Sequence, residues 1–244
     1  MAVNINCDMG ESFGLYKMGD DVALMPFITE ANVACGFHAS DPNHMRTTVA
    51  LAKEHGVKVG AHFSLPDLVG FGRREMKMNR DEMANIIAYQ VGALKAFLDM
   101  ADVPLNHLKP HGSLYGMAAK QEHIAQAVAD VGVHYKVPVF GLAGTLQEEV
   151  YNARGLEFCG EYYADLDYTD EGGLIITREH HAVDPQTAAT RCLRAVEEGK
   201  TESINGKELD VRAESICVHS DTPNAVAVAD AVRTALAPHI ASAA

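Results

Sequence analysis

Residues 57–62 of the sequence read Val-Lys-Val-Gly-Ala-His, a short β-compatible run that leads directly into a histidine. The arrangement recurs three more times: ACGFH ends on His38, LKPH on His111 and ICVH on His219. Each run has the length and apolar character of a buried strand in a parallel sheet. Ligands of parallel α/β folds bind beyond the carboxyl ends of the strands. We therefore expect these three histidines and His62 to converge on one pocket.

Runs of this kind alternate with longer segments of helical period, which is typical of parallel strands joined by crossover helices. The helical period is clearest from Met83 to Leu98, where apolar residues recur every three or four positions. Asn79 and Glu82 stand before this segment as a cap and its partner. About seven strands are expected, over residues 3–7, 31–35, 57–61, 105–109, 137–142, 156–159 and 215–218.

Three residue pairs that end in proline predict further helix starts. At 41–42, 184–185 and 222–223 an Asp or Thr stands directly before a proline, which suits a capping side chain followed by the first helical residue. Gly56 and Gly199 are the matching helix stops.

Two segments interrupt the alternation, near residues 162–181 and 201–212, and we interpret both as insertions. The second contains Asn205-Gly206 between β-compatible residues, which predicts a hairpin with a type I′ turn. Nothing resembling a linker divides the chain, and an α/β barrel of this size forms one domain. We therefore expect residues 1–244 to form a single parallel β/α domain.

Composition narrows the function classes. The chain has 244 residues, with 33 acidic and 20 basic side chains and a formal net charge of −13, which excludes a basic nucleic-acid binder. The longest stretch without a charged residue has 12 residues, too short to span a bilayer. The N-terminus lacks the pattern of a secretory signal, and the five cysteines show no Cys-x-x-Cys spacing. These features predict a cytoplasmic protein with reduced thiols and no membrane partner.

Carboxylates share the strand-end location with the histidines. Asp8 and Glu11 follow the first expected strand, where it gives way to Gly10. Asp41 and Asp221 stand near helix-opening prolines, so capping explains either of them as well as ligand binding does. A hydrogen-bonded structural role explains any single strand-end histidine equally well, but four together favour a common site.

Cations are also candidates for the pocket. Lys109 ends the fourth expected strand, and Arg73 and Arg74 lie in the long loop after the third, where a guanidinium could bind a carboxylate or phosphate in bidentate fashion. Their alternative roles are a surface lysine and structural salt bridges. The remaining candidates for substrate binding are Tyr115, Glu161, Asp165 and Arg178.

Familiar nucleotide and hydrolase motifs are absent: the chain has no G-x-x-x-x-G-K-[ST], G-x-G-x-x-G, H-E-x-x-H or G-x-S-x-G. Asp8, His38 and His62 would suit zinc or a related ion. Strand-end spacing alone does not establish such a site, so the use of a metal stays open.

Six ordered blocks covering nearly the whole chain resemble the LamB/YcsF family. They are NINCDMGE (4–11), ANVACGFHASDP (31–42), VGAHFSLPDLVGFGRR (59–74), HLKPHGSLYG (107–116), EYYAD with GGLIITR (161–178) and ICVHSDTP (216–223). The resemblance implies a distorted seven-stranded parallel β/α barrel, TIM-like and related to the glycoside hydrolase and deacetylase barrels. It also implies the function of the A subunit in an ATP-dependent 5-oxoprolinase, which opens the 5-oxoproline lactam to glutamate together with subunits B and C.

Within this resemblance, Asp8 or Glu11 would be the general base for the attacking water, and a strand-end histidine would exchange protons with the leaving nitrogen. Lys109 would stabilise the oxyanion, and Arg73 or Arg74 would bind the substrate carboxylate. Because no nucleotide motif is present, we expect ATP, the co-substrate, to bind largely on a partner protein or at a shared interface. A homo-oligomer is compatible with the sequence.

Several positions depart from the usual pattern of the family. Leu166 and Asp167 replace an arginine and a glycine, Phe63 replaces a proline and Ser220 a glycine. Loss of an arginine removes a fixed cation, which predicts altered recognition of an anionic substrate. A related lactam, cyclic imide or amide is therefore an alternative substrate. A self-sufficient metal-dependent amidohydrolase or deacetylase and a noncatalytic binding protein are the alternative functions.

Overall fold

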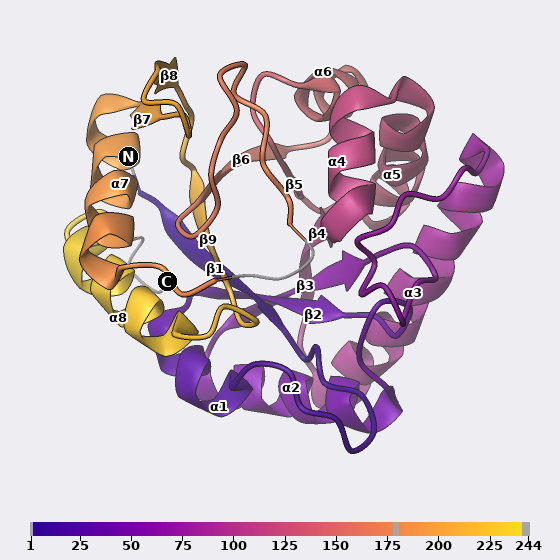
Figure 1. Ribbon diagram of the computed structural model, residues 1–244. Coiled ribbons are helices and arrows are strands. Elements are labelled where there is room, and N and C mark those ends of the chain that lie inside the picture. Colours follow the sequence, from indigo (N-terminus) through magenta and orange to yellow (C-terminus); the bar gives the residue numbers. More distant parts are fainter. Residues whose placement is uncertain (1, 178–180, 241–244) are drawn as a thin grey trace.

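The structure is a computed structural model that describes residues 2–177 and 181–240. Seven parallel strands close into a barrel in the order β1-β2-β3-β4-β5-β6-β9 (Figure 1), which confirms the expected fold. The barrel strands are β1 (Asn4–Met9), β2 (Glu30–Ala34), β3 (Lys58–Phe63), β4 (Leu105–Pro110), β5 (Val139–Gly141), β6 (Phe158–Tyr163) and β9 (Ser215–His219).

Helices surround the barrel, and α7, which precedes β9, lies beside α8, which follows β9 (Figure 1). No helix among residues 2–177 and 181–240 combines the length and apolar character needed to cross a bilayer. The helices are α1 (Asp21–Leu24), the 3-10 turn η1 (Met25–Phe27), α2 (Pro42–His55), α3 (Arg80–Ala101), α4 (Gly112–Lys120), α5 (Glu122–Tyr135), α6 (Leu146–Ala153), α7 (Pro185–Glu198) and α8 (Ala225–Leu236).

The capping pattern explains where most helices begin. Asn79 accepts a hydrogen bond from the backbone N–H of Glu82 at 2.9 Å, and Asp41 and Asp184 cap α2 and α7 as expected. The start expected at Thr222-Pro223 is wrong, because α8 begins two residues later. The Thr222 hydroxyl donates instead to a carboxylate, that of Asp165, at 3.1 Å.

One expected boundary and one expected turn type also need correction. β6 continues to Tyr163, so Tyr162 and Tyr163 belong to the barrel and not to the insertion expected from residue 162. The second insertion is the antiparallel hairpin of β7 (Lys200–Glu202) and β8 (Glu208–Asp210). Of the Asn-Gly pair in its loop only Gly206 has a positive φ, and the N–H of Gly206 donates to the carbonyl of Ser203. The turn is therefore not the expected type I′, which needs positive φ at both central residues.

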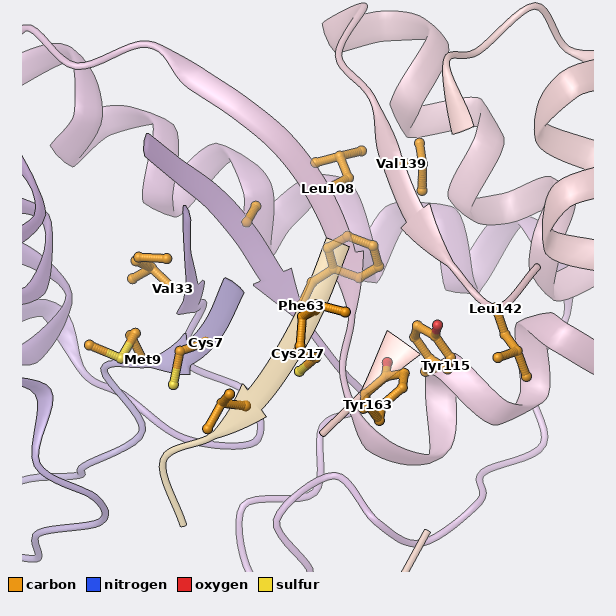
Figure 2. Packing of buried hydrophobic residues seen from close by; sticks show 14 of the residues in the cluster. Cys7, Met9, Val33, Phe63, Leu108, Tyr115, Val139, Leu142, Tyr163 and Cys217 are labelled. Carbon is orange, nitrogen blue, oxygen red and sulfur yellow. The ribbon is translucent and has the colours of Figure 1, made fainter. Parts of the chain in front are cut away.

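Alternate residues along each barrel strand serve different layers. Cys7, Met9 and Val33 lie together in the apolar layer between strands and helices (Figure 2). The residues between them, such as Asn6 and Asp8, point into the barrel, where they meet polar side chains from other strands. Both sets are buried, as expected of parallel strands covered by helices, but the barrel interior is polar.

A glycine provides the space for one of these interior side chains. A Cβ on Gly60 of β3 would lie 2.1 Å from Nε2 of His107 on β4. The His107 ring is stacked on Phe140 with 4.1 Å between centroids, and its Nε2 lies 2.7 Å from Asn32 Oδ1. Any side chain at position 60 would overlap the His107 ring, which is fixed by Phe140 and Asn32, so this position requires glycine.

Candidate functional site

A cavity of about 30 Å³ lies at the carboxyl ends of the barrel strands, where the residues of the site meet. Its polar lining comes from β1, β3, β4, β6, β9, α4 and the loops after the strands, and Leu166, Leu174 and Ile176 form an apolar wall. A neighbouring cavity of about 280 Å³ shares part of this wall. The polar residues lining the small cavity are Asp8, His62, Arg73, Lys109, His111, Tyr115, Tyr163 and His219.

Asp8 and Lys109 form a buried ion pair at the floor of the cavity, with 3.0 Å between Asp8 Oδ1 and Lys109 Nζ. Burial by itself would raise the pKa of Asp8, but His62 and Lys109 outweigh it and hold this pKa well below its ordinary value. Burial would likewise lower the pKa of Lys109, whereas the Asp8 carboxylate and its other neighbours hold it well above its usual range. Both groups are therefore charged in the folded protein.

The lysine is surrounded by acceptors. Nζ of Lys109 lies 3.0 Å from Asn6 Oδ1, 3.0 Å from Cys217 Sγ and 3.1 Å from Glu161 Oε1, in addition to Asp8. An ammonium group has three N–H donors, and four partners already surround this one. The geometry thus gives Lys109 the role of anchoring Asp8, and Glu161 the role of a second counter-ion below it.

A polar network in the strands supports this pair, and sequence reasoning missed it. Asn32 donates to Asp8 Oδ1 at 2.8 Å and to Asn6 Oδ1 at 2.7 Å, and His107 contacts Asn32 in turn. The sequence does contain a signal for this network, because Asn6 stands two residues before Asp8, and His107 stands two residues before Lys109. A period of two places such residues on one face of a strand.

His219 is oriented by a carboxylate behind it. Its Nδ1 lies 2.8 Å from Asp165 Oδ1, and its backbone N–H donates to Asp165 Oδ2 at 2.9 Å. Burial would lower the pKa of His219, but Asp165 outweighs burial and raises it. The other ring nitrogen, Nε2, lies 3.7 Å from Asp8 Oδ2. A histidine that carries a proton readily thus faces an ionised aspartate across the cavity.

Glu11 and three histidines form a second group beside Asp8. Glu11 Oε1 lies 3.0 Å from His38 Nε2, 3.3 Å from His111 Nδ1 and 4.0 Å from His62 Nε2. Burial, followed by the negative charge of Asp8, raises the pKa of Glu11 well above its usual value. Burial also lowers the pKa values of His38 and His111.

Two sets of potential metal ligands occur among the described residues. One consists of Glu11, His38, His62 and His111, and the other of Asp8, Cys217 and His219. Within each set the candidate ligand atoms all lie within 4.8 Å of one another. The trio considered from sequence, Asp8 with His38 and His62, is divided between the two sets.

The two arginines have different surroundings. Arg73 lines the cavity with a side chain that is 5% exposed and lies 2.9 Å from Asp221 Oδ2, with its guanidinium 4.9 Å from the centre of the Phe71 ring. Arg74 is largely exposed and pairs with the buried carboxylate of Asp67, outside the cavity lining. Arg73 is therefore the arginine that can reach a ligand, and Arg74 ties down its own loop.

The other candidates are more widely placed. Asp41 accepts hydrogen bonds from the backbone of Gly14 and Asn43 at 2.8 and 2.7 Å, so its oxygens serve a loop and a helix start outside the cavity. Tyr115 on α4 lies beside Tyr163 on β6 at the cavity, with 5.8 Å between ring centroids (Figure 2). Arg178 lies outside the described residues.

The chain resembles known proteins over almost its full length. The family model described as the LamB/YcsF family matches residues 3–243. The chain is 44% identical over 240 residues to a protein of Staphylococcus carnosus named as the A subunit of 5-oxoprolinase, covering 97% of this chain and 95% of that protein. It is 46% identical over 231 residues to the lactam utilization protein lamB of Emericella nidulans, covering 92% and 90%.

A solved structure extends the likeness to three dimensions. The crystal structure of the lactam utilization protein from Thermus thermophilus matches with a TM-score of 0.90 and 43% sequence identity, covering 98% of this chain and 97% of that one. Sequence and fold thus agree over almost the full length of each chain compared. The chain belongs to the LamB/YcsF family.

Proposed function

We propose that the chain is the A subunit of an ATP-dependent hydrolase that opens 5-oxoproline or a related cyclic amide. The names of its relatives support a lactam-related role. The observation that carries the proposal is the pairing of Asp8 and His219, which face each other across one cavity in opposite protonation states, an ionised carboxylate and a readily protonated imidazole. Lactam opening needs such a pair, one group to accept a proton from water and another to give one to the leaving nitrogen.

Asp8 is the proposed general base. Its Oδ1 is held by Lys109 and Asn32, whereas Oδ2 faces the cavity between His62 and His219. Water bound at Oδ2 transfers a proton to it while the oxygen attacks the lactam carbonyl carbon. Because both partners of Oδ1 are fixed in strands, the base keeps its orientation through the reaction.

His219 is the proposed general acid. Its Nδ1 donates to Asp165, so the proton that it transfers is on Nε2, the nitrogen nearer to Asp8. When the ring C–N bond breaks, the nitrogen takes this proton and becomes the amine of the product. Asp165 is a positioning residue that fixes the ring orientation and stabilises the protonated imidazole.

Arg73 is the proposed binder of the substrate carboxylate. It is the one arginine that lines the cavity among the described residues, and Asp221 and Phe71 orient its guanidinium. The apolar wall next to it contains Leu166, at a position where the family resemblance implies an arginine. A cyclic amide with less negative charge than 5-oxoproline is therefore the alternative substrate for this pocket.

ATP and the partner subunits complete the proposed reaction. A lactam is a poor electrophile, and phosphorylation of its carbonyl oxygen by ATP, which leaves ADP, would make attack by water favourable. A second water then releases the phosphoryl group as inorganic phosphate, which leaves the free carboxylate of the product. The sequence offers no glycine-rich phosphate loop. We therefore assign most nucleotide contacts to subunits B and C or to their interface with this chain. Tight binding of ATP to the isolated chain, measured by calorimetry, would contradict this assignment.

The test is turnover by the chain reconstituted with its B and C subunits, ATP and a panel of lactams, following amine and phosphate release together. Asp8→Asn is expected to lower kcat by at least about 10²-fold, the usual contribution of general acid–base catalysis. Asp41→Asn is the control, because Asp41 caps α2 outside the cavity. Unchanged turnover in Asp8→Asn removes Asp8 from the mechanism, and turnover of a cyclic amide without partners or ATP favours a self-sufficient amidohydrolase.

A further inference from the structure

His62 and His111 bring two ring nitrogens close together, and neither of these nitrogens is the one that faces a backbone carbonyl. Nδ1 of His62 lies 3.0 Å from the backbone carbonyl oxygen of Lys109, and Nε2 of His111 lies 2.8 Å from that of Phe71. A carbonyl oxygen only accepts hydrogen bonds, so each of these nitrogens carries the N–H. In a neutral imidazole the opposite nitrogen then presents a lone pair.

Those two lone pairs point into the same small volume. Nε2 of His62 and Nδ1 of His111 are 3.0 Å apart. The Glu11 carboxylate oxygen Oε1 is 3.3 Å from the His111 nitrogen, and Asp8 Oδ2 is 3.3 Å from the His62 nitrogen. Several electron-rich atoms thus surround one point in a buried environment. Such an arrangement is stable only when something positive lies between them.

We propose that Glu11 Oε1, His62 Nε2 and His111 Nδ1 bind a divalent transition-metal ion of the zinc type. Ligand atoms of a tetrahedral ion with bonds of about 2.0–2.1 Å are about 3.3 Å apart. The three separations in this set are 3.0, 3.3 and 4.0 Å, close to that spacing. Two histidines with one carboxylate leave a fourth position open, as in catalytic zinc sites.

Neighbouring groups hold the three proposed ligands in the way that metal ligands are usually held. Metal-bound histidines donate their other N–H to a carbonyl or carboxylate, and both His62 and His111 do so. The ligating carboxylate is itself hydrogen-bonded, because His38 Nε2 lies 3.0 Å from Glu11 Oε1. His38 then keeps a lone pair on Nδ1, a buried nitrogen for which no hydrogen-bond partner is found among the described residues. This assignment makes His38 a positioning residue and not a ligand.

The three ligands adjoin the proposed reaction centre. Asp8 Oδ2, beside His62, also faces His219. A metal at this point would therefore lie next to the water that Asp8 binds. The inference itself rests on the lone pairs and their spacing, and it holds whichever ring the enzyme opens.

The experiment measures metal in the protein without substrate. The purified chain is stripped with a chelator, dialysed against Zn²⁺ or Co²⁺ and assayed by elemental analysis and visible absorption. We expect one ion per chain, and a Co²⁺ spectrum of nitrogen and oxygen ligands without a thiolate charge-transfer band. Zn²⁺ is also expected to raise the thermal unfolding midpoint.

Variants locate the ion. Glu11→Gln, His62→Gln and His111→Gln are each expected to lose stoichiometric metal and its stabilising effect. His38→Gln should weaken binding by about 10- to 100-fold, which is the effect of removing an outer-shell partner. His219→Gln is the matched control, since His219 is also buried but belongs to the other ligand set. Circular dichroism of each variant separates loss of the site from loss of the fold.

Two results would overturn the proposed metal site. A wild-type chain that takes up no stoichiometric Zn²⁺ or Co²⁺ overturns the proposal, and a protonated His62 paired with Asp8 then explains the geometry. A thiolate band, or loss of metal only in His219→Gln, assigns the ion to Asp8, Cys217 and His219 and also overturns it. If none of the ligand variants folds, stoichiometry and the Co²⁺ spectrum of the wild type decide.

Discussion

Replacement of Lys109 by methionine tests the central ion pair directly. The change keeps most of the side-chain volume and removes only the ammonium group. Asp8 and Glu161 then remain buried without the cation that lies 3.0 and 3.1 Å from their oxygens. Because the side chains of all three are at most 4% exposed, water cannot replace the lost partner.

The expected cost is about 3–5 kcal/mol in the free energy of unfolding, which is typical when one partner of a buried ion pair is removed. This is a large part of the total for a domain, about 5–15 kcal/mol. Adding Glu161→Gln to Lys109→Met removes one of the stranded charges. The double variant should therefore lose less free energy of unfolding than the two single variants together, with a coupling energy of about 0.5–3 kcal/mol.

Urea unfolding followed by circular dichroism measures both quantities. Lys95→Met is the matched control, because Lys95 pairs with Asp99 one helical turn away on the surface of α3. Its expected effect is within about 0.5 kcal/mol. If Lys109→Met costs less than about 1 kcal/mol, or if the double variant shows no coupling, the barrel interior does not depend on this pair as argued.

Three further outcomes follow from the structure and are measured by the same unfolding assay. Gly60→Ala should destabilise the protein by about 1–3 kcal/mol, because the added Cβ meets the His107 ring. Gly92→Ala lies at an open position on α3 and should stabilise the protein by about 0.5–1 kcal/mol. Equal effects of the two substitutions would contradict the packing argument. Asn79→Ala should cost about 1 kcal/mol through the lost cap of α3, and no change would show that the cap bond is dispensable. Burial raises the pKa of Glu30 to about 7 from 4.5, so the folded state binds the extra proton. The contribution of Glu30 protonation to the free energy of unfolding is complete below about pH 4.5 and is lost as the pH rises through about 7. The free energy of unfolding then changes by at most about 1.4 kcal/mol per pH unit. Glu30→Gln should remove this slope, and an unchanged slope would assign it to another group.

Local sequence patterns were sufficient for much of the fold. Helix starts at Asp41 and Asp184 are governed by neighbours a few residues away, since a capping oxygen bonds to the next turn. The exception, Thr222, shows the limit of this reasoning. Its hydroxyl reaches Asp165, 57 residues earlier in the chain, and no local pattern reveals that partner.

The same limit applies to the site. Strand-end placement identified Asp8, Lys109 and His219 as candidates that the barrel brings to one cavity. It did not distinguish Arg73 from Arg74, because adjacent residues in a loop look alike until their partners, Asp221 and Asp67, are known.

The sequence by itself determined the alternation of strands and helices, the family and the end of the barrel where polar side chains gather. These properties depend on periodicity and on short-range capping, which are encoded locally. Only the tertiary structure decided which oxygen of Asp8 is held by Lys109 and Asn32, and which nitrogens of His62 and His111 face backbone carbonyls. Those states depend on contacts such as that between Lys109 and Asp8, 101 residues apart, which exist only once the barrel closes.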